Sequence, residues 1–232
     1  MMVNSFENEQ MQLYDVAFSS LIALEAQSLS LLAEILDRDD ESMLLHQRAK
    51  EMRNLIAEHL WNKEIHTFCN KFPNGTFYER ITPTSFYALL AQAATDTQAD
   101  ALVNNWLMNP NHFCISETWP AGVNNTCYWG LPSINAADPA FPPLGYWRGF
   151  VWGPMAQLTY WSLLQYDHVP SVRAGRKALC KQMTEMGMKM WREHRHICEN
   201  FSPHQDASDC TGTVFYHWGG LTMLISLLEA GY

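Results

Sequence analysis

The sequence of 232 residues predicts an all-α fold. In segment after segment, apolar residues recur at the three- and four-residue spacing of a helix, and no segment makes a convincing case for a sheet. Short, plain connections at 37–40 and 167–170 alternate with longer loops rich in polar and aromatic residues. This rhythm predicts a stack of helical hairpins decorated on one face.

Four helices are expected in the first half of the chain. Asp40 can cap the second of them, and Pro83 lies at the start of the third. The turn-rich stretch 62–80 has room for a short hairpin around Pro73-Asn74-Gly75, an evident reverse turn. The expected ranges are 12–36, 40–61, 82–94 and 97–108.

The second half begins with a long connection, residues 109–149, which holds six prolines, four glycines and several aromatics. Connections of this length inside a domain are usually functional or disordered, and the aromatic content favours function. Helices are expected at 151–166, from Pro170 to an irregular segment at 194–213, and at 218–230. The Met-rich stripe of the helix after Pro170 is interpreted as core.

Composition limits the classes of function. Hydrophobic residues make up 47% and charged residues 17% of the chain, which excludes a disordered protein. The formal charge of −9 and the lack of any Lys/Arg run argue against nucleic acid and anionic membranes as partners. The longest apolar run, 13–36, carries three acidic residues, so no membrane span is expected, and no signal peptide is recognised.

The cysteines leave the cellular compartment open. Cys114/Cys127 and Cys198/Cys210 each bracket a polar loop, a spacing typical of local disulfides. Three glycosylation sequons also favour a secretory-pathway parent. Reduced thiols and chance sequons carry equal weight, because a signal peptide is not found. The sequons begin at Asn74, Asn124 and Asn200.

Two segments carry residues suited to chemistry on sugars. In the first, Arg148 lies among the aromatics Tyr146, Trp147 and Trp152, just before a helix. Flat aromatic faces suit sugar rings, and Arg offers fixed donors to hydroxyls or a carboxylate. From these residues alone, the favoured interpretation is that Trp147 and Trp152 are core and Arg148 pairs with a helix carboxylate.

The second segment places Glu199 at the mouth of a polar loop, before a helix that begins at Trp218. Such a Glu can act as a general base if it reaches a water molecule, although a solvated surface Glu is the commoner case.

A zinc site is the competing interpretation of this region, because six possible ligands crowd 24 residues. Their spacing matches no finger or protease pattern, and two histidines two residues apart do not share a helix face. No metal or other cofactor is therefore expected. The six are His194, His196, Cys198, His204, Cys210 and His217.

Together the two segments resemble glycoside hydrolase family 63 and, more loosely, the trehalase-like enzymes. The resemblance rests on Tyr146-Trp147-Arg148-Gly149-Phe150-Val151-Trp152, on Glu199-Asn200-Phe201 and on His217-Trp218-Gly219-Gly220-Leu221. Gly130-Leu131-Pro132-Ser133 and Asp138-Pro139 resemble the preceding loop. The match covers most of the chain and is strongest from about 129 to 232.

The resemblance implies an (α/α)6 toroid and inverting hydrolysis of α-glycosides, with Glu199 as general base. It further implies that the partner is an oligosaccharide or small glycoside, and that Arg148 braces the loop or binds substrate. The pocket would be shaped by Tyr146, Trp147, Arg148, Trp152 and Trp218.

The departures from the family pattern are equally informative. The family's acid is an Asp in an Asp-Asn-Ser-Pro-like motif, whereas this chain reads Val3-Asn4-Ser5-Phe6, and Val cannot donate a proton. Asp15 fits the helix pattern and is assigned a structural role. About seven of twelve helices are expected, so residues 1–232 read as the C-terminal part of a catalytic domain, weakly active or inactive alone. The alternative is a non-catalytic carbohydrate-binding or assembly remnant that self-associates through exposed helix faces.

Overall fold

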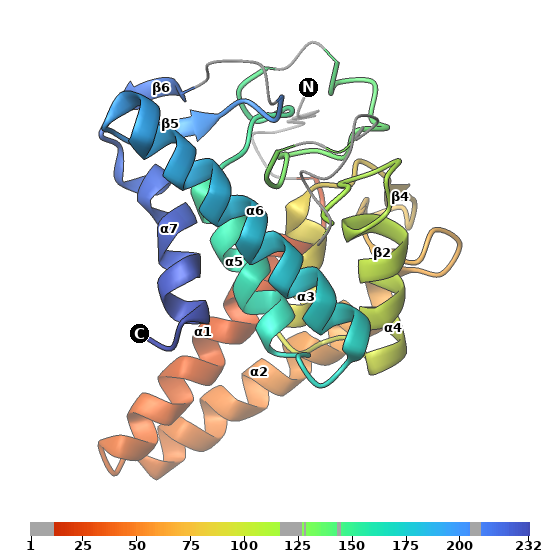
Figure 1. Ribbon diagram of the computed structural model, residues 1–232. Coiled ribbons are helices and arrows are strands. Elements are labelled where there is room, and N and C mark those ends of the chain that lie inside the picture. Colours follow the sequence, from red (N-terminus) through yellow and green to blue (C-terminus); the bar gives the residue numbers. More distant parts are fainter. Residues whose placement is uncertain (1–11, 117–126, 128, 143–144, 205–209) are drawn as a thin grey trace.

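The computed structural model describes residues 12–116, 127, 129–142, 145–204 and 210–232. In these residues the fold is all-α, as predicted, with three small two-stranded antiparallel hairpins beside the helices (Figure 1). The helices are α1 (Val16–Ile35), α2 (Asp39–His59), α3 (Tyr87–Leu90), α4 (Asp96–Leu102), α5 (Gly153–Leu164), α6 (Pro170–His194) and α7 (His217–Glu229). The hairpins pair β1 (Trp61–Asn62) with β2 (Thr67–Phe68), β3 (Asn70–Lys71) with β4 (Phe77–Tyr78), and β5 (Cys198–Phe201) with β6 (Cys210–Val214).

Alternate helices pack side by side and form an arc. Helix α1 contacts α3, α3 contacts α5, and α5 contacts α7, so the odd-numbered helices make one row. Helix α2 packs along α1, and α6 packs along α5 and α7, which places them in a second row (Figure 1). The α1–α2 hairpin projects from the rest of the molecule at one end of the arc.

Local chemistry explains where several helices begin. Asp15 caps α1, because its Oδ1 accepts the Phe18 N–H at 2.8 Å. Pro170 occupies the first position of α6, where its missing N–H is not needed. The expectation for Asp40 was wrong: α2 begins at Asp39 without a side-chain cap. Asp39, Asp40 and Glu41 instead lie in its first turn, where they complement the helix dipole.

Two expected helices are interrupted. The helix expected over 82–94 is a 3₁₀ turn, η1 (Pro83–Phe86), followed by the short α3, and it ends because Gln92 adopts a left-handed φ of 57°. The helix expected over 97–108 changes at Val103 into a π-helical segment, η2 (Val103–Leu107). Inside η2, the indole Nε1 of Trp106 donates to the Ile65 carbonyl, so a contact with a distant segment accompanies the change.

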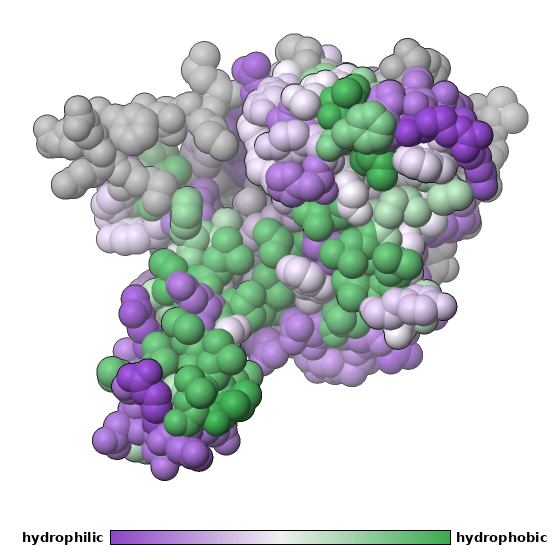
Figure 2. All heavy atoms as spheres, turned by 90° about the vertical axis from the view of Figure 1, so that its left-hand side faces the viewer, coloured by the Kyte–Doolittle hydropathy of each residue, from purple (hydrophilic) through white to green (hydrophobic). Residues whose placement is uncertain are grey.

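The buried face of helix α1 consists mainly of small residues, and several of its large residues are exposed. Its buried face consists of Val16, Ser20, Ala23, Ala26, Ser30 and Ala33, whereas Leu29, Leu31, Leu32 and Ile35 on other faces are exposed. Figure 2 shows apolar side chains gathered on the projecting hairpin. A close α1–α2 approach explains the small residues, but this chain supplies no cover for the large ones among its described residues.

This composition also corrects the expectation that no segment could span a membrane. Among the described residues one helix, α1, is long and apolar enough to do so by length and composition, with a mean hydropathy of 1.5 over its most apolar window. Three acidic residues counted against a membrane span in the sequence. Asp15 lies outside the helix as its cap, so only Glu25 and Glu34 lie within α1. In the fold, α1 packs against α2 and α3.

The segment 194–213, expected to be irregular, contains the β5–β6 hairpin. Its strands are joined by the Cys198–Cys210 disulfide, and Cys114–Cys127 forms a second disulfide, so both local pairings are present. The hairpin also pairs with the long connection, because Val151 and Phe201 exchange two backbone hydrogen bonds of 2.8 and 3.0 Å. On its other side Val151 bridges to Pro132, so three distant segments lie together.

Candidate active site

Glu199 lies on β5, where two residues of β6 oppose it. Cys198 pairs with Val214 and Asn200 with Thr211, so Gly212 and Thr213 together face Glu199 in a bulge. The Thr213 N–H donates to Oε2 of Glu199 at 3.2 Å. A bulge commonly redirects a side chain, and here it supplies a backbone donor to the carboxylate.

Tyr146 holds the other oxygen of this carboxylate. Its hydroxyl donates to Oε1 of Glu199 at 2.8 Å, although the two residues are 53 positions apart. This hydrogen bond is the main cause that raises the pKa of Tyr146 above its ordinary value. The two residues predicted to share a site therefore lie in direct contact.

The backbone at Tyr146 is held in a conformation that few side chains adopt. Its φ is 46°, in the left-handed region. The indole Nε1 of Trp152 donates to the Tyr146 carbonyl at 3.1 Å, and the Gly145 and Arg148 backbones exchange two hydrogen bonds across the turn. These contacts keep the Tyr146 hydroxyl beside Glu199.

Aromatic rings form one cluster next to the carboxylate. Trp147 stacks on Trp152 with ring centroids 3.6 Å apart and planes 12° apart. Trp218 approaches both rings at an angle, at 6.1 and 5.8 Å, and Tyr146 meets Trp152 edge-on at 4.7 Å. Trp152 is fully buried, so it supports Trp147 from behind, whereas Tyr146, Trp147 and Trp218 keep exposed surface.

Arg148 and Trp147 line a small cavity of about 180 Å³. Arg148 is exposed there, and Asp15 and Arg80 lie in the same lining. Asp15 is already engaged as the cap of α1, and its Oδ2 accepts Asn70 Nδ2 at 2.8 Å, which agrees with the structural role expected for it. Val3, where the resemblance would place an acid, lies outside the described residues.

Two residues that shape this site, Gly212 and Thr213, were not identified from the sequence. The Thr213 donor is a backbone group, which any residue type provides. Gly212 has a φ of 76°, and a Cβ there would lie 2.5 Å from Oε2 and 2.9 Å from Cβ of Glu199. Glycine is therefore required here both by the positive φ and by the close approach of the Glu199 side chain. A glycine shortly after the candidate base was the feature of the sequence that could have pointed to this position.

The zinc interpretation meets a covalent obstacle. His196, Cys198 and Cys210 offer ligand atoms within 4.8 Å of one another. The two cysteines are joined to each other, however, and a disulfide offers no thiolate to a metal ion. His217, another of the predicted zinc ligands, is not part of this group, and its ring stacks on Tyr216.

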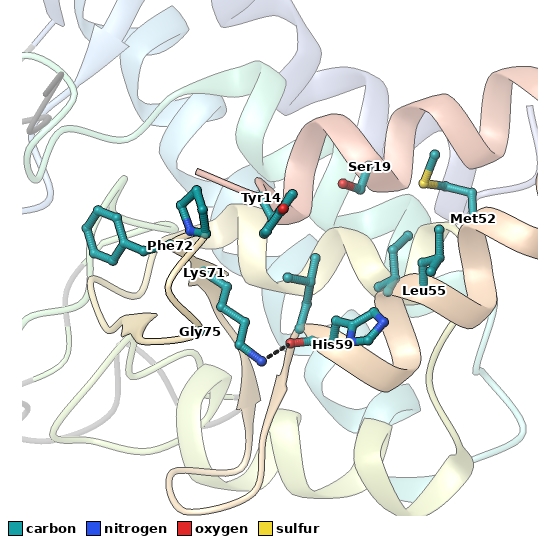
Figure 3. A pocket seen from close by; sticks show the side chains of 11 residues that line it. Tyr14, Ser19, Met52, Leu55, His59, Lys71, Phe72 and Gly75 are labelled. Carbon is teal, nitrogen blue, oxygen red and sulfur yellow. Dashed lines mark hydrogen bonds between the residues drawn. The ribbon is translucent and has the colours of Figure 1, made fainter. Parts of the chain in front are cut away.

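A larger cavity, of about 570 Å³, has a different set of lining residues (Figure 3). Residues of α1, the end of α2 and the β3–β4 hairpin line it, and none of the predicted site residues takes part. The lining is mostly apolar, and the ammonium of Lys71 donates to the His59 carbonyl at one side. The lining of this larger cavity therefore includes none of the residues predicted to carry the chemistry.

Comparisons with known proteins place this geometry in context. A protein-family profile, described as the mannosylglycerate hydrolase MGH1-like glycoside hydrolase domain, matches residues 4–219. Among solved structures, the family 63 mannosylglycerate hydrolase of Thermus thermophilus in complex with glucose has a TM-score of 0.66 at 20% identity, over 94% of this chain and 48% of its own. No curated protein sequence matches.

Two further structures share the fold. Neutral trehalase Nth1 from Saccharomyces cerevisiae has a TM-score of 0.69 at 18% identity, over 95% of this chain and 38% of its own. A protein named only as a sialidase has 0.71 at 15% identity, over 92% and 20%. The chain thus spans about half the length of the mannosylglycerate hydrolase it matches, and its arc of helices is an incomplete (α/α)6 toroid.

Proposed function

The chain belongs to the mannosylglycerate hydrolase MGH1-like glycoside hydrolase family, and on that premise we propose that it supplies the general-base half of an inverting α-glycosidase site, with Glu199 as the base. The observation that carries this proposal is the position of the Glu199 carboxylate, fixed between the Tyr146 hydroxyl and the Thr213 N–H beside an aromatic cluster. Each carboxylate oxygen receives one of these donors and keeps a lone pair for a water molecule.

The chemistry assigned to Glu199 is proton removal from that water. The oxygen of the water attacks the anomeric carbon, the glycosidic bond breaks, and a separate acid protonates the leaving oxygen. Tyr146 and Trp147 present flat faces to the sugar, Trp218 closes the edge of the cluster, and Trp152 holds Trp147 in place. Arg148, exposed in the small cavity, is assigned to a hydroxyl or carboxylate of the substrate.

The acid is the part of the site not found among the described residues. The carboxylate in the small cavity is that of Asp15, and it is committed to a helix cap and to Asn70. General acid catalysis typically contributes about 10²–10⁴-fold. Because Val3 stands where the resemblance places that acid, we expect the chain alone to hydrolyse glycosides weakly or not at all. The substrates proposed for a complete enzyme are α-glucosides and glucosyl- or mannosylglycerate.

The first test compares turnover with binding. The purified chain is incubated with mannosylglycerate, glucosylglycerate and trehalose; released sugar is measured, and binding is followed by calorimetry. Binding without turnover is expected, and Trp147→Ala should weaken it. Robust hydrolysis by the chain alone would contradict the proposal that it supplies only the general-base half of the site.

The second test concerns the base. Glu199→Gln keeps the shape of the side chain but cannot accept a proton from water, so in a full-length relative the corresponding change should abolish hydrolysis while binding persists. Asp15→Asn is the matched control, because Asp15 lies in the cavity but serves as a cap. Unchanged hydrolysis after loss of the Glu would end its assignment as base.

The alternative function is a non-catalytic carbohydrate-binding or assembly remnant of the same fold. The exposed large side chains of α1, among them Leu29, Leu32 and Ile35, favour it, because apolar surface of this extent is usually covered by another protein surface. Analytical ultracentrifugation distinguishes the cases. Self-association that Leu32→Glu abolishes, together with sugar binding that Glu199→Gln leaves intact, would support the alternative.

A further inference from the structure

The β3–β4 hairpin ends in Asn74-Gly75-Thr76, which has the sequence of an N-glycosylation acceptor. The turn is closed by two backbone hydrogen bonds, from Phe72 N–H to the Thr76 carbonyl at 2.8 Å and from Gly75 N–H to the Phe72 carbonyl at 2.9 Å. Gly75 has a φ of 90°, and nothing lies within 4 Å of where its Cβ would be. Pro73 to Thr76 are all exposed, so the tripeptide stands clear of the fold.

The Asn74 side chain is oriented by the third residue of the tripeptide. Its Oδ1 accepts the Thr76 backbone N–H at 3.0 Å and the Thr76 hydroxyl at 2.7 Å. Both bonds engage the amide oxygen and neither engages Nδ2, the atom that would receive a sugar. The Thr76 hydroxyl therefore contacts the amide in the ordered, exposed turn.

The sequon at Asn200 has the opposite environment. Asn200 is only 1% exposed, lies in β5, and its Oδ1 accepts a hydrogen bond from the Thr211 hydroxyl across the hairpin. Ser202, the third residue of that sequon, is 7% exposed. A branched sugar on Asn200 would require this part of the hairpin to open. Asn124 lies outside the described residues.

We propose that Asn74 is a covalent N-glycan acceptor and that Asn200 is not. In this step Nδ2 of Asn74 forms a bond to the anomeric carbon of an oligosaccharide carried on a lipid pyrophosphate. The bond from that carbon to the pyrophosphate breaks, the lipid pyrophosphate leaves, and the amide loses one proton. The two disulfides are compatible with a compartment in which this chemistry occurs.

The position gives the glycan a structural consequence. Pro73 and Gly75, on either side of Asn74, line the cavity of about 570 Å³ that is otherwise walled mostly by apolar side chains (Figure 3). A bulky, hydrated sugar on Asn74 would lie next to two residues of the cavity lining, and it would hinder other proteins from docking there.

The test uses the full 232-residue chain behind a cleavable secretion signal, in a cell line that adds N-glycans. Enzymatic deglycosylation converts a glycan-bearing Asn to Asp, and peptide mapping then reports each site. Conversion is expected at Asn74 and not at Asn200. Thr76→Ala should remove the Asn74 glycan, Thr76→Ser should keep it, and Ser202→Ala should leave the glycan content unchanged.

Translation of the same chain into microsomes gives a second readout that does not depend on secretion. The membrane-protected product should carry the Asn74 glycan in the parent and lack it in Asn74→Gln. An unmodified Asn74 in either system, while a control glycoprotein is modified, would overturn the proposal. A glycan on Asn200 in folded protein would overturn the argument from burial.

Discussion

Replacing Gly212 by alanine tests how the candidate base is positioned. At φ 76° a Cβ is strained, which costs about 1–2 kcal/mol. The new Cβ would also lie 2.5 Å from Oε2 of Glu199, well inside a normal carbon–oxygen contact of about 3.3 Å, and 2.9 Å from its Cβ, which cannot swing away. Overpacking of this kind adds about 1–3 kcal/mol, so Gly212→Ala should lower the free energy of unfolding by about 2–5 kcal/mol.

Alanine substitutions at two other glycines separate the backbone strain from the steric clash in this loss of stability. Gly75 has a φ of 90° and open space at its Cβ, so Gly75→Ala carries the backbone strain alone, about 1–2 kcal/mol. Gly220 lies in α7 and is also open, so Gly220→Ala should stabilise the protein by about 0.5–1 kcal/mol. Urea unfolding followed by tryptophan fluorescence measures all three variants.

The difference between Gly212→Ala and Gly75→Ala isolates the contact with Glu199. An equal loss of stability in the two variants would mean that the Glu199 carboxylate is not held against Gly212. A second readout is the pKa of Tyr146, which should fall toward its ordinary value in Gly212→Ala, because displacement of Glu199 breaks the bond that raises it.

Three further outcomes are expected. Glu199→Gln should also lower the pKa of Tyr146, measured by ultraviolet titration with Tyr146→Phe as the blank. The hydrogen bond to the carboxylate stabilises the protonated hydroxyl, so it persists above the ordinary tyrosine pKa and is lost as pH rises through the raised pKa of Tyr146. Serine at both Cys198 and Cys210 should cost about 2–4 kcal/mol in urea unfolding, and an unchanged midpoint would mean that the disulfide is not formed. Gly153→Ala would drive a Cβ into the carbonyl oxygen of Trp218 in the first turn of α7, so soluble protein with native circular dichroism would contradict the observed α5–α7 packing.

Where local sequence and packing agreed, the helices could be predicted. The stripe Leu179, Met183, Met186 and Met190 is buried in α6, and Pro170 marks its start, because spacing and the first-turn preference of proline act over a few residues. The end of α3 could not be predicted, because it depends on partners far along the chain. The Ala91 carbonyl accepts from Arg53, and the Gln92 side chain donates to Gln165.

The candidate site divides in the same way. Glu199 and Tyr146 were identified by resemblance to a family, and the structure places them 2.8 Å apart, a distance that no spacing in the sequence encodes. The resemblance grouped Trp152 with the pocket walls, whereas its complete burial makes it the support of Trp147. The donor at Thr213 was invisible, because a backbone N–H has no identity in the sequence.

The projecting α1–α2 hairpin has a consequence for local stability. Its far end, around Ile35, Leu36, Met43 and Leu44, is exposed, so opening this end sacrifices contacts within the pair alone. Amides there should exchange with deuterium through local fraying, at a free energy well below that of global unfolding. Amides of the buried α5–α6 core should exchange only through global unfolding. The protein would then contain two cooperative units within one continuous arc of helices.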